Sequence, residues 1–437
     1  MKRIYLAFIA LLTFSVVAQA EVKIQEVTSP GGIKAWLVEE HSIPFASLEI
    51  RFKGGASLDP KGKRGAINLM VGLLEEGAAD KNARQFAAAT EGLAASFGFD
   101  VGDDAMSVSA QFLTENRDDA MALLRTALLE PRFDEDAIAR VKAQVVSAIQ
   151  SAVTDPDKIS GRTFDRLAFG DHPYATSING TLESVAALTR DDLFAAKDAV
   201  MARDRLYVGA VGDITPEELG KLLDDLLGDL PAVGAKMPEK AAFLLKGGMT
   251  VVPFDTPQSV VTFGLEGIER HDPDFFAAYV MNTVLGGSGR QSRLMEEVRE
   301  KRGLTYGVYT YLMPKDYAAL YMGRVASAND RVAQAVQVIR DEWVKMAENG
   351  VTAEELEGAK TYLTGAYPLR FDGNGPIANI LVGMQMDDLP IDYITTRNDK
   401  INAVTLEDIK RVAKRLVRPD DLHFVVVGKP VGLESTE

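Results

Sequence analysis

The chain contains two copies of one pattern, and this internal duplication constrains its fold more than any other feature. Three segments of the first half recur in the second half in the same order: a helical stretch, a helix start and a closing strand. The matched pairs are 134–149 with 352–367, 185–193 with 401–409, and 203–213 with 419–429. The first pair is offset by 218 residues and the other two by 216. Three matches in register indicate two structurally similar units.

Hydrophobic periodicity gives the content of each unit. Residues 105–113 and 319–327 alternate apolar and polar side chains, which predicts strands of sheets with one covered face. Residues 117–129 and 330–347 carry apolar side chains at three- and four-residue spacing, which predicts helices. The expected fold class is therefore α+β, with two homologous domains that each consist of an antiparallel sheet backed by helices.

Domain boundaries follow from composition. A proline- and lysine-containing stretch at 231–243 is the predicted linker between an N-terminal domain at 21–230 and a C-terminal domain at 244–437. Residues 1–20 combine two basic residues, an apolar run and Ala-Gln-Ala, which predicts a signal peptide cleaved after Ala20 and a periplasmic protein. An uncleaved membrane anchor is the alternative, although the apolar run is short for a span. No other segment is long and apolar enough to cross a bilayer.

Composition excludes several classes of function. A net charge of −15 argues against nucleic acid and against an anionic membrane surface as partners. The chain has no cysteine, which excludes disulfides, a thiolate nucleophile and a cysteine zinc site. Its four histidines, His41, His172, His271 and His423, are each about a hundred residues or more apart, so no local two-histidine metal motif exists. A site assembled from distant histidines stays open.

The segment GAINLMVGLLEEGA at 65–78 is predicted to be a helix that follows the strand-like 47–60. This arrangement resembles the insulinase/pitrilysin family of zinc peptidases, whose H-x-x-E-H motif lies on such a helix. In that family two histidines bind the metal and the glutamate activates water. The histidine positions fall on Asn68 and Gly72, and the glutamate position falls on Val71. The resemblance therefore implies a degenerate zinc site.

The family's third zinc ligand is a glutamate further along the chain. Its position matches Ala148, or Ser147 if the alignment slips by one residue, and neither can replace a glutamate ligand. We therefore expect this chain to bind no metal. Glu75 and Glu76 follow on the same helix, but a carboxylate pair without histidine suits a harder ion than zinc. Helix-end surface charges are the favoured interpretation of these two residues.

Two further segments extend the resemblance over nearly the whole mature chain. HPYATSINGTLESVAALTRDDL at 172–193 looks like a stretch near the end of the family's first domain. LGGSGRQSRLMEEVREKRGLTYGVYTY at 285–311 is similar to the second-domain signature of short bacterial two-subunit members and of mitochondrial processing peptidase. Within it, Arg299 and Tyr306 match the arginine–tyrosine pair that holds the substrate backbone. Both side chains can donate to a peptide carbonyl or an oxyanion. An ordinary surface ion pair for Arg299 and helix-end packing for Tyr306 are the alternative.

A glycine-rich run, Gly286, Gly287, Ser288 and Gly289, lies at the start of this segment. It lacks the lysine and serine or threonine of a phosphate-binding loop and the spacing of a dinucleotide fingerprint. In the family the corresponding loop borders the substrate chamber. We therefore expect a flexible chamber loop here rather than a nucleotide site.

The resemblance implies one half of a clam-shell chamber. On this basis we expect a non-zinc, substrate-binding subunit of a heterodimeric periplasmic metalloendopeptidase that acts on peptides or small unfolded proteins. Its H-x-x-E-H-bearing sister subunit would hold the zinc, and this chain alone would be inactive. The alternative is an inactive peptidase-like binding or assembly protein, as a single chain or as a homodimer, in the way that the core subunits of respiratory complex III show for this scaffold. A serine hydrolase finds little support, because no G-x-S-x-G elbow is present.

Overall fold

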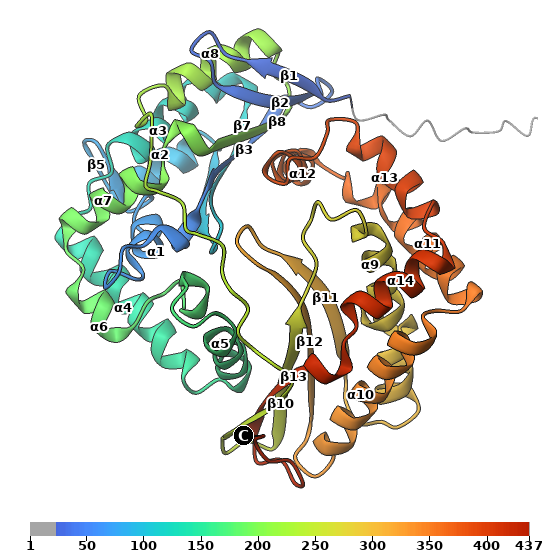
Figure 1. The fold of residues 1–437 in the computed structure, drawn as a ribbon. Coiled ribbons are helices and arrows are strands. Elements are labelled where there is room, and N and C mark those ends of the chain that lie inside the picture. Colours follow the sequence, from blue (N-terminus) through green and yellow to red (C-terminus); the bar gives the residue numbers. More distant parts are fainter. Residues whose placement is uncertain (1–22, 437) are drawn as a thin grey trace, which may run out of the picture.

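The computed structural model describes residues 23–436, so the predicted signal peptide lies outside the described residues. Two sheets form the framework (Figure 1). The first has the order β1-β2-β8-β3-β7-β6, and its strands are β1 (Gln25–Thr28), β2 (Lys34–Glu39), β3 (Phe45–Lys53), β6 (Ser96–Val101), β7 (Ala105–Leu113) and β8 (Leu206–Gly212). The second has the order β11-β12-β10-β13-β9, and its strands are β9 (Gly248–Pro253), β10 (Gln258–Glu266), β11 (Val308–Pro314), β12 (Ala319–Ala328) and β13 (His423–Gly428). A small hairpin pairs β4 (Gly77–Ala78) with β5 (Lys81–Asn82).

The two sheets have equivalent topology. Strands β2-β8-β3-β7-β6 correspond in order to β9-β13-β10-β12-β11. Within each set every neighbouring pair is antiparallel except β2 with β8 and β9 with β13, which are parallel. The α+β architecture of two similar units is confirmed, but the sheets are mixed rather than wholly antiparallel. The reason is that each closing strand returns through helices instead of a hairpin, and inserts beside the first strand in the same direction.

The helices repeat in the same way. The first half contains α1 (Ala66–Val71), α2 (Ala83–Gly92), α3 (Arg117–Leu129), α4 (Glu135–Ala152), α5 (Pro156–Phe169), α6 (Leu182–Ala187), α7 (Arg190–Val200) and α8 (Pro216–Leu227). The second half contains α9 (Phe275–Asn282), α10 (Val332–Asn349), α11 (Ala353–Ala366), α12 (Asn374–Met386), α13 (Tyr393–Asn402) and α14 (Leu406–Leu416). Among the helices of residues 23–436, none combines the length and apolar character that a membrane span needs.

Local sequence explains why equivalent helices begin at equivalent places. α7 and α14 both start with a capping box, in which Thr189 accepts a hydrogen bond from the Asp192 amide and Thr405 accepts one from the Asp408 amide. Each aspartate in turn accepts a bond from the amide of its threonine, so two otherwise orphaned donors are satisfied at each helix start. The matched segments at 185–193 and 401–409 therefore encode the same helix start.

The two halves exchange one helix each. α5 belongs to the first half but packs on β10 and β13 of the second sheet, whereas α12 belongs to the second half but packs on β8 and β3 of the first sheet (Figure 1). The two helices begin 218 residues apart, so they are equivalent in the duplication. Each forms an apolar cluster with its host sheet: Phe164 and Ala168 of α5 contribute to one, and Ala378 and Leu381 of α12 contribute to the other.

Close contacts fix both exchanged helices. A methyl group on Gly209 of β8 would lie 2.6 Å from the Ala378 carbonyl oxygen, so only glycine permits α12 to approach this strand so closely. The side chain of Gln385 donates to the Val208 carbonyl at 2.8 Å. On α5, the buried hydroxyl groups of Ser160 and Thr262 are hydrogen-bonded at 2.8 Å. Polar contacts therefore fix the register of both helices beyond what apolar packing alone specifies.

A polar network joins the β6–β7 turn of the first half to the equivalent β11–β12 turn of the second. The Tyr174 hydroxyl donates to the Asp104 carboxylate and accepts a bond from the Tyr317 amide at 3.1 Å. Lys315 donates to Asp103 at 2.6 Å, and its ammonium lies 3.7 Å from the centre of the Tyr174 ring. Burial raises the pKa of Asp104 and of Tyr174. The HPY stretch thus supplies a tyrosine that links the two halves.

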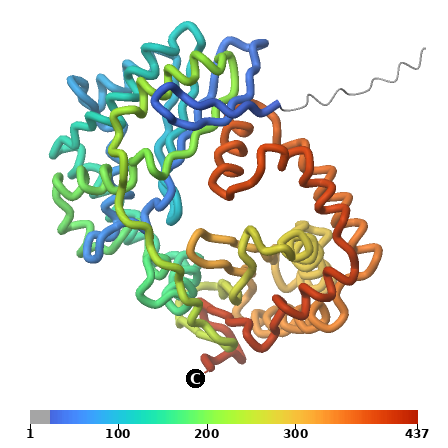
Figure 2. The backbone as a smooth tube through the Cα atoms, turned by 45° about the horizontal axis from the view of Figure 1, so that its top comes forward, coloured from blue at the N-terminus to red at the C-terminus, as the bar shows by residue number. Residues whose placement is uncertain are grey.

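The segment between α8 and β9, residues 228–247, forms neither helix nor strand and includes the predicted linker. It runs from the first half to the second, as the yellow-green trace in Figure 2 shows. It is held at several points: the Arg205 guanidinium donates to the Ala235 carbonyl at 2.7 Å, the Ala241 amide donates to the Tyr317 carbonyl at 2.8 Å, and the Leu244 amide donates to the Ala168 carbonyl at 2.8 Å. This connection is therefore packed against both halves.

Replacing Tyr174 by phenylalanine should destabilise the protein by about 1–3 kcal/mol, because a buried carboxylate and a backbone amide each lose a partner. Equilibrium denaturation in urea measures the change. Tyr362→Phe is the matched control, because this side chain is 46% exposed and makes no side-chain hydrogen bond within residues 23–436. Equal stability of the two variants would show that the network contributes nothing.

Candidate functional site

The helix that carries the degenerate zinc positions is held by a buried aspartate before it. The two carboxylate oxygens of Asp59 accept hydrogen bonds from the amides of Gly65 and Ile67, at 2.8 and 2.9 Å. Burial is the largest influence on this carboxyl group and raises its pKa to about 6. Arg64 lies 3.6 Å from Asp59 and reaches across to the carbonyl oxygens of Ser177 and Thr176. This anchoring fixes the position of α1 against the segment that follows α5.

α1 is shorter than the sequence predicted. The expected helix at 65–78 ends at Val71, with Gly72 as its cap, and residues 77–78 form the strand β4. Gly77 has a φ of 120°, a backbone conformation that favours glycine and is incompatible with a continuing helix. The prediction failed because an apolar run containing glutamates has helical periodicity whether or not a glycine interrupts it.

The three positions of the H-x-x-E-H motif lie together at the end of α1, and none of them offers a ligand that zinc takes: Asn68 is half-buried, Val71 is buried and Gly72 is exposed. Asn68 donates from its side-chain amide to the Asn179 side chain at 3.1 Å. Val71 is 4% exposed and belongs to the apolar core. A methyl group on Gly72 would lie 3.2 Å from Val141 of α4. An amide pair and apolar packing therefore occupy the place of two imidazoles and a carboxylate.

The candidate third position does not restore a site. Ala148 and its neighbour Ser147 are exposed on α4, and Ala148 offers only a methyl group. Across residues 23–436 no three histidine, aspartate or glutamate side chains cluster in a way that could hold a metal ion. The donor set around α1 therefore does not fit zinc, which requires nitrogen, sulfur or carboxylate ligands in tetrahedral geometry.

Of the remaining groups considered, Glu76 and three of the four histidines have structural partners. Glu76 pairs with Arg140 at 2.5 Å, and Glu75 is exposed. His41 contacts Asp213 at 2.7 Å and Glu39 at 3.2 Å, and hydrogen bonding to Asp213, then to Glu39, raises its pKa. Burial instead lowers the pKa of the other two partnered histidines: His172 bonds the Glu239 carbonyl and His423 the Lys246 carbonyl. His271 is exposed elsewhere.

Arg299 and Tyr306 lie on either side of a turn that follows a helical segment, Met295–Glu300. The turn folds back on that segment, because the Leu304 amide donates to the Val298 carbonyl at 2.9 Å and both side chains are buried. Arg299 makes one ion pair, with the adjacent Glu300 at 3.5 Å. Tyr306 is 87% exposed. Within residues 23–436 its hydroxyl group has no hydrogen-bond partner, and no hydrogen bond joins Tyr306 to Arg299. Tyr306 is thus presented to solvent rather than packed at a helix end.

The predicted glycine loop is partly helical. Gly286 and Gly287 belong to the helical turn Thr283–Gly287 that continues α9, whereas Ser288 and Gly289 lie beyond it. A methyl group on Gly286 would lie 2.4 Å from the Thr310 hydroxyl oxygen of β11. Gly286 therefore allows the helix to contact the strand closely, which differs from the flexible loop that we expected.

The two halves exchange a helix, the first half has the motif positions without metal ligands, and the second half has Arg299 and an exposed Tyr306. Together these features define the scaffold of a zinc peptidase that lacks its own metal ligands. The insulinase model, peptidase family M16, matches residues 34–182, and the peptidase M16 inactive-domain model matches residues 187–363. A non-peptidase homolog named YmxG from Helicobacter pylori is 30% identical over 395 residues, covering 89% of this chain and 90% of that protein. The chain belongs to peptidase family M16, as a catalytically inactive, peptidase-like member.

Further relatives agree with the assignment to the family. An uncharacterized zinc protease from Streptomyces coelicolor is 25% identical over 405 residues, covering 90% of this chain and 86% of that protein. The crystal structure of a peptidase M16 inactive domain from Pseudomonas fluorescens has a TM-score of 0.88 and 28% identity, and the match covers 95% of this chain and all of that one. A protease from Helicobacter pylori has the same fold, with a TM-score of 0.83 at 17% identity.

Restoring the motif alone should not create a zinc site. In the variant Asn68→His/Val71→Glu/Gly72→His, a third ligand is still absent at Ala148, and the Val141 side chain must shift slightly to admit the histidine at 72. We expect dialysed wild-type and variant proteins to retain far less than one zinc per chain by elemental analysis. Tight stoichiometric zinc in the wild type would contradict the degenerate site.

Asp59 should make stability depend on pH in a specific direction. Its pKa of about 6 in the folded protein exceeds the ordinary value, so the native state binds the extra proton. The contribution of this group is therefore full below about pH 4 and is lost as the pH rises through about 6. Urea unfolding of the wild type and of Asp59→Asn should be compared across this pH range. The free energy of unfolding should fall less with rising pH in the variant. The same dependence of the free energy of unfolding on pH in both proteins would contradict the raised pKa of the buried Asp59 carboxyl group.

Proposed function

We propose that this chain is the non-zinc, substrate-binding subunit of a heterodimeric zinc metalloendopeptidase located in the periplasm. The sister subunit carries an intact H-x-x-E-H motif and the zinc, and the substrates are peptides or small unfolded proteins. Each chain forms one half of a clam-shell chamber. The periplasmic location rests on the predicted signal peptide at 1–20 alone.

One observation carries the proposal: this chain lacks the family's metal-binding residues but keeps the residues of its arginine–tyrosine pair. The metal-binding residues are replaced: Asn68 pairs with Asn179, Val71 belongs to the apolar core, and Gly72 has no side chain. Tyr306, by contrast, keeps a phenol that is 87% exposed and has no hydrogen-bond partner within residues 23–436. A purely structural protein has no need to present such a group. The retained tyrosine supports a role in binding a substrate on which another chain acts.

The chemistry of the pair suits a peptide carbonyl. Arg299 supplies a permanently charged guanidinium, and Tyr306 supplies a neutral O–H donor. Two donors directed at one oxygen hold the carbonyl in place and stabilise the negative charge that develops on it during attack. The ion pair of Arg299 with Glu300 is partly exposed and 3.5 Å long, so a substrate oxygen can replace it at little cost.

The second candidate is a catalytically inactive binding or assembly protein, as a single chain or as a homodimer. The relative from Helicobacter pylori is named a non-peptidase homolog, and this favours the alternative. A tagged pull-down from the native periplasm, with partners identified by mass spectrometry, separates the two. A stoichiometric protein bearing H-x-x-E-H supports the divided peptidase. Recovery of the chain alone or as a homodimer supports the alternative.

In a reconstituted pair, Arg299→Ala and Tyr306→Phe should each lower kcat/KM for a fluorogenic peptide by about 10²-fold, the usual effect of losing one oxyanion donor. Tyr309→Phe is the matched control, because this nearby tyrosine is 47% exposed and stacks on Tyr311. Circular dichroism checks that each variant is folded. Full activity of both variants would remove the role assigned to the pair.

A further inference from the structure

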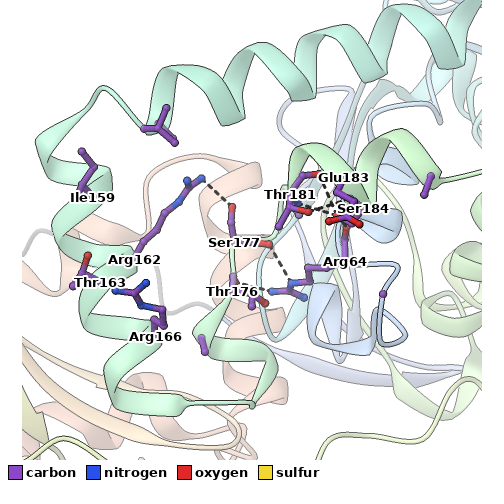
Figure 3. A pocket seen from close by; sticks show the side chains of 16 residues that line it. Arg64, Ile159, Arg162, Thr163, Arg166, Thr176, Ser177, Thr181, Glu183 and Ser184 are labelled. Atoms are coloured by element: carbon purple, nitrogen blue, oxygen red, sulfur yellow. Dashed lines mark hydrogen bonds between the residues drawn. The ribbon is translucent and has the colours of Figure 1, made fainter.

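A cavity of about 790 Å³ lies between α5 and the segment that runs from residue 175 to 187. Figure 3 shows its walls: Arg162 and Arg166 project from α5, and Arg64 reaches toward Ser177 from the opposite side. This volume is in the range of sites that take drug-sized ligands or short peptide segments. Neither the degenerate zinc positions nor the arginine–tyrosine pair lines it.

The cavity carries excess positive charge in a protein whose net charge is −15. Arg162 and Arg166 lie one helical turn apart on α5, where like charges repel each other unless an anion lies between or beside them. Arg162 makes one side-chain hydrogen bond, to the Ser177 hydroxyl at 3.3 Å, and has no carboxylate partner within the described chain. Within residues 23–436 Arg166 has no side-chain partner at all. The one acidic residue of the lining, Glu183, pairs with neither arginine.

The opposite wall is rigid and presents hydroxyl groups. Arg64 is neutralised by Asp59 and Asp103, and it donates to the Ser177 carbonyl at 3.1 Å, which fixes this segment. Thr181 and Ser184 form the capping box of α6 at the cavity edge. Asn179, in the same segment, holds Asn68 of α1. Arg162 and Arg166 thus face a polar wall that is already fixed in position, and this wall contacts α1 through Asn179.

The apolar part of the lining distinguishes between possible anions. It consists of Ala152, Val153, Ile159, Ala175 and Ala187. Val153 is 59% exposed although it is a large apolar side chain. An inorganic ion would occupy a small part of the volume and leave this apolar surface in water. A carboxylate suits the planar guanidinium fork, and an adjacent aliphatic group suits the apolar wall.

We propose that this cavity binds an acidic, apolar-flanked peptide segment, with its carboxylate between Arg162 and Arg166 and its aliphatic side chains against the wall formed by Val153 and Ile159. The identification of the ligand as a peptide rests on the proposed function, whereas the anionic chemistry rests on the cavity itself. The pocket would then select acidic segments of a substrate beside the helix that has lost its zinc ligands.

Calorimetric titration of the isolated full chain tests the proposal, with an eight-residue end-blocked peptide of alternating leucine and glutamate as the probe. Arg162→Gln/Arg166→Gln should weaken binding by about tenfold or more, since charge-assisted forked bonds are lost. The control Arg84→Gln/Arg203→Gln removes the same charge from two exposed residues outside the cavity and should bind as wild type does. Arg162→Lys/Arg166→Lys should fall between them, because it keeps the charge without the fork.

No peptide binding, or equal loss in the glutamine and control variants, would overturn the proposal. Inorganic phosphate that binds as tightly as the peptide would overturn the assignment of a carboxylate next to an apolar group. Because the measurement needs no sister subunit, failure to find a partner in the periplasm leaves its result intact.

Discussion

Burial of apolar surface by the two exchanged helices is the interaction on which the rest of the structure depends. α5 covers the second sheet and α12 covers the first, and each forms its apolar cluster with strands of the other half. Without its exchanged helix, a sheet would expose one apolar face to water, at a cost that grows with the exposed area. The halves are therefore expected to fold as one cooperative unit. The polar network of Tyr174, Asp104 and Lys315 then fixes how the two halves meet.

This framework explains how the metal ligands on α1 could be lost while the arginine–tyrosine pair of the second half was kept. α1 is held by Asp59 and Arg64, so the replacement of its metal ligands by Asn68 and Gly72 leaves the helix in position. The turn that carries Tyr306 depends instead on buried contacts of Val298 and Leu304 in the second half. Each functional region is supported by its own local core. Substitutions at one region therefore need not disturb the other.

The sequence predicted the duplication, the main strands and the helices α3 and α10, because periodicity and capping residues are local signals. It could not predict the helix exchange, because the apolar stripe of Phe164 and Ala168 is compatible with packing on either sheet. It also overextended α1, since Gly72 and Gly77 interrupt a run whose periodicity continues. The basic cavity was missed, although the four-residue spacing of Arg162 and Arg166 is visible. Their lack of carboxylate partners is a tertiary property that no sequence pattern reports.

The exchange of α5 and α12 also bears on the origin of the chain. In two separate units of half this length, the same exchange of helices would be the arrangement of a domain-swapped homodimer. Gene duplication and fusion would convert those two copies into one polypeptide, and residues 228–247 would be the join. After such a fusion the two copies could change independently, since the zinc-motif positions lie in the first half and the arginine–tyrosine pair lies in the second. A first half without metal ligands on α1 and a second half with an exposed tyrosine show the kind of difference that two such duplicates would accumulate.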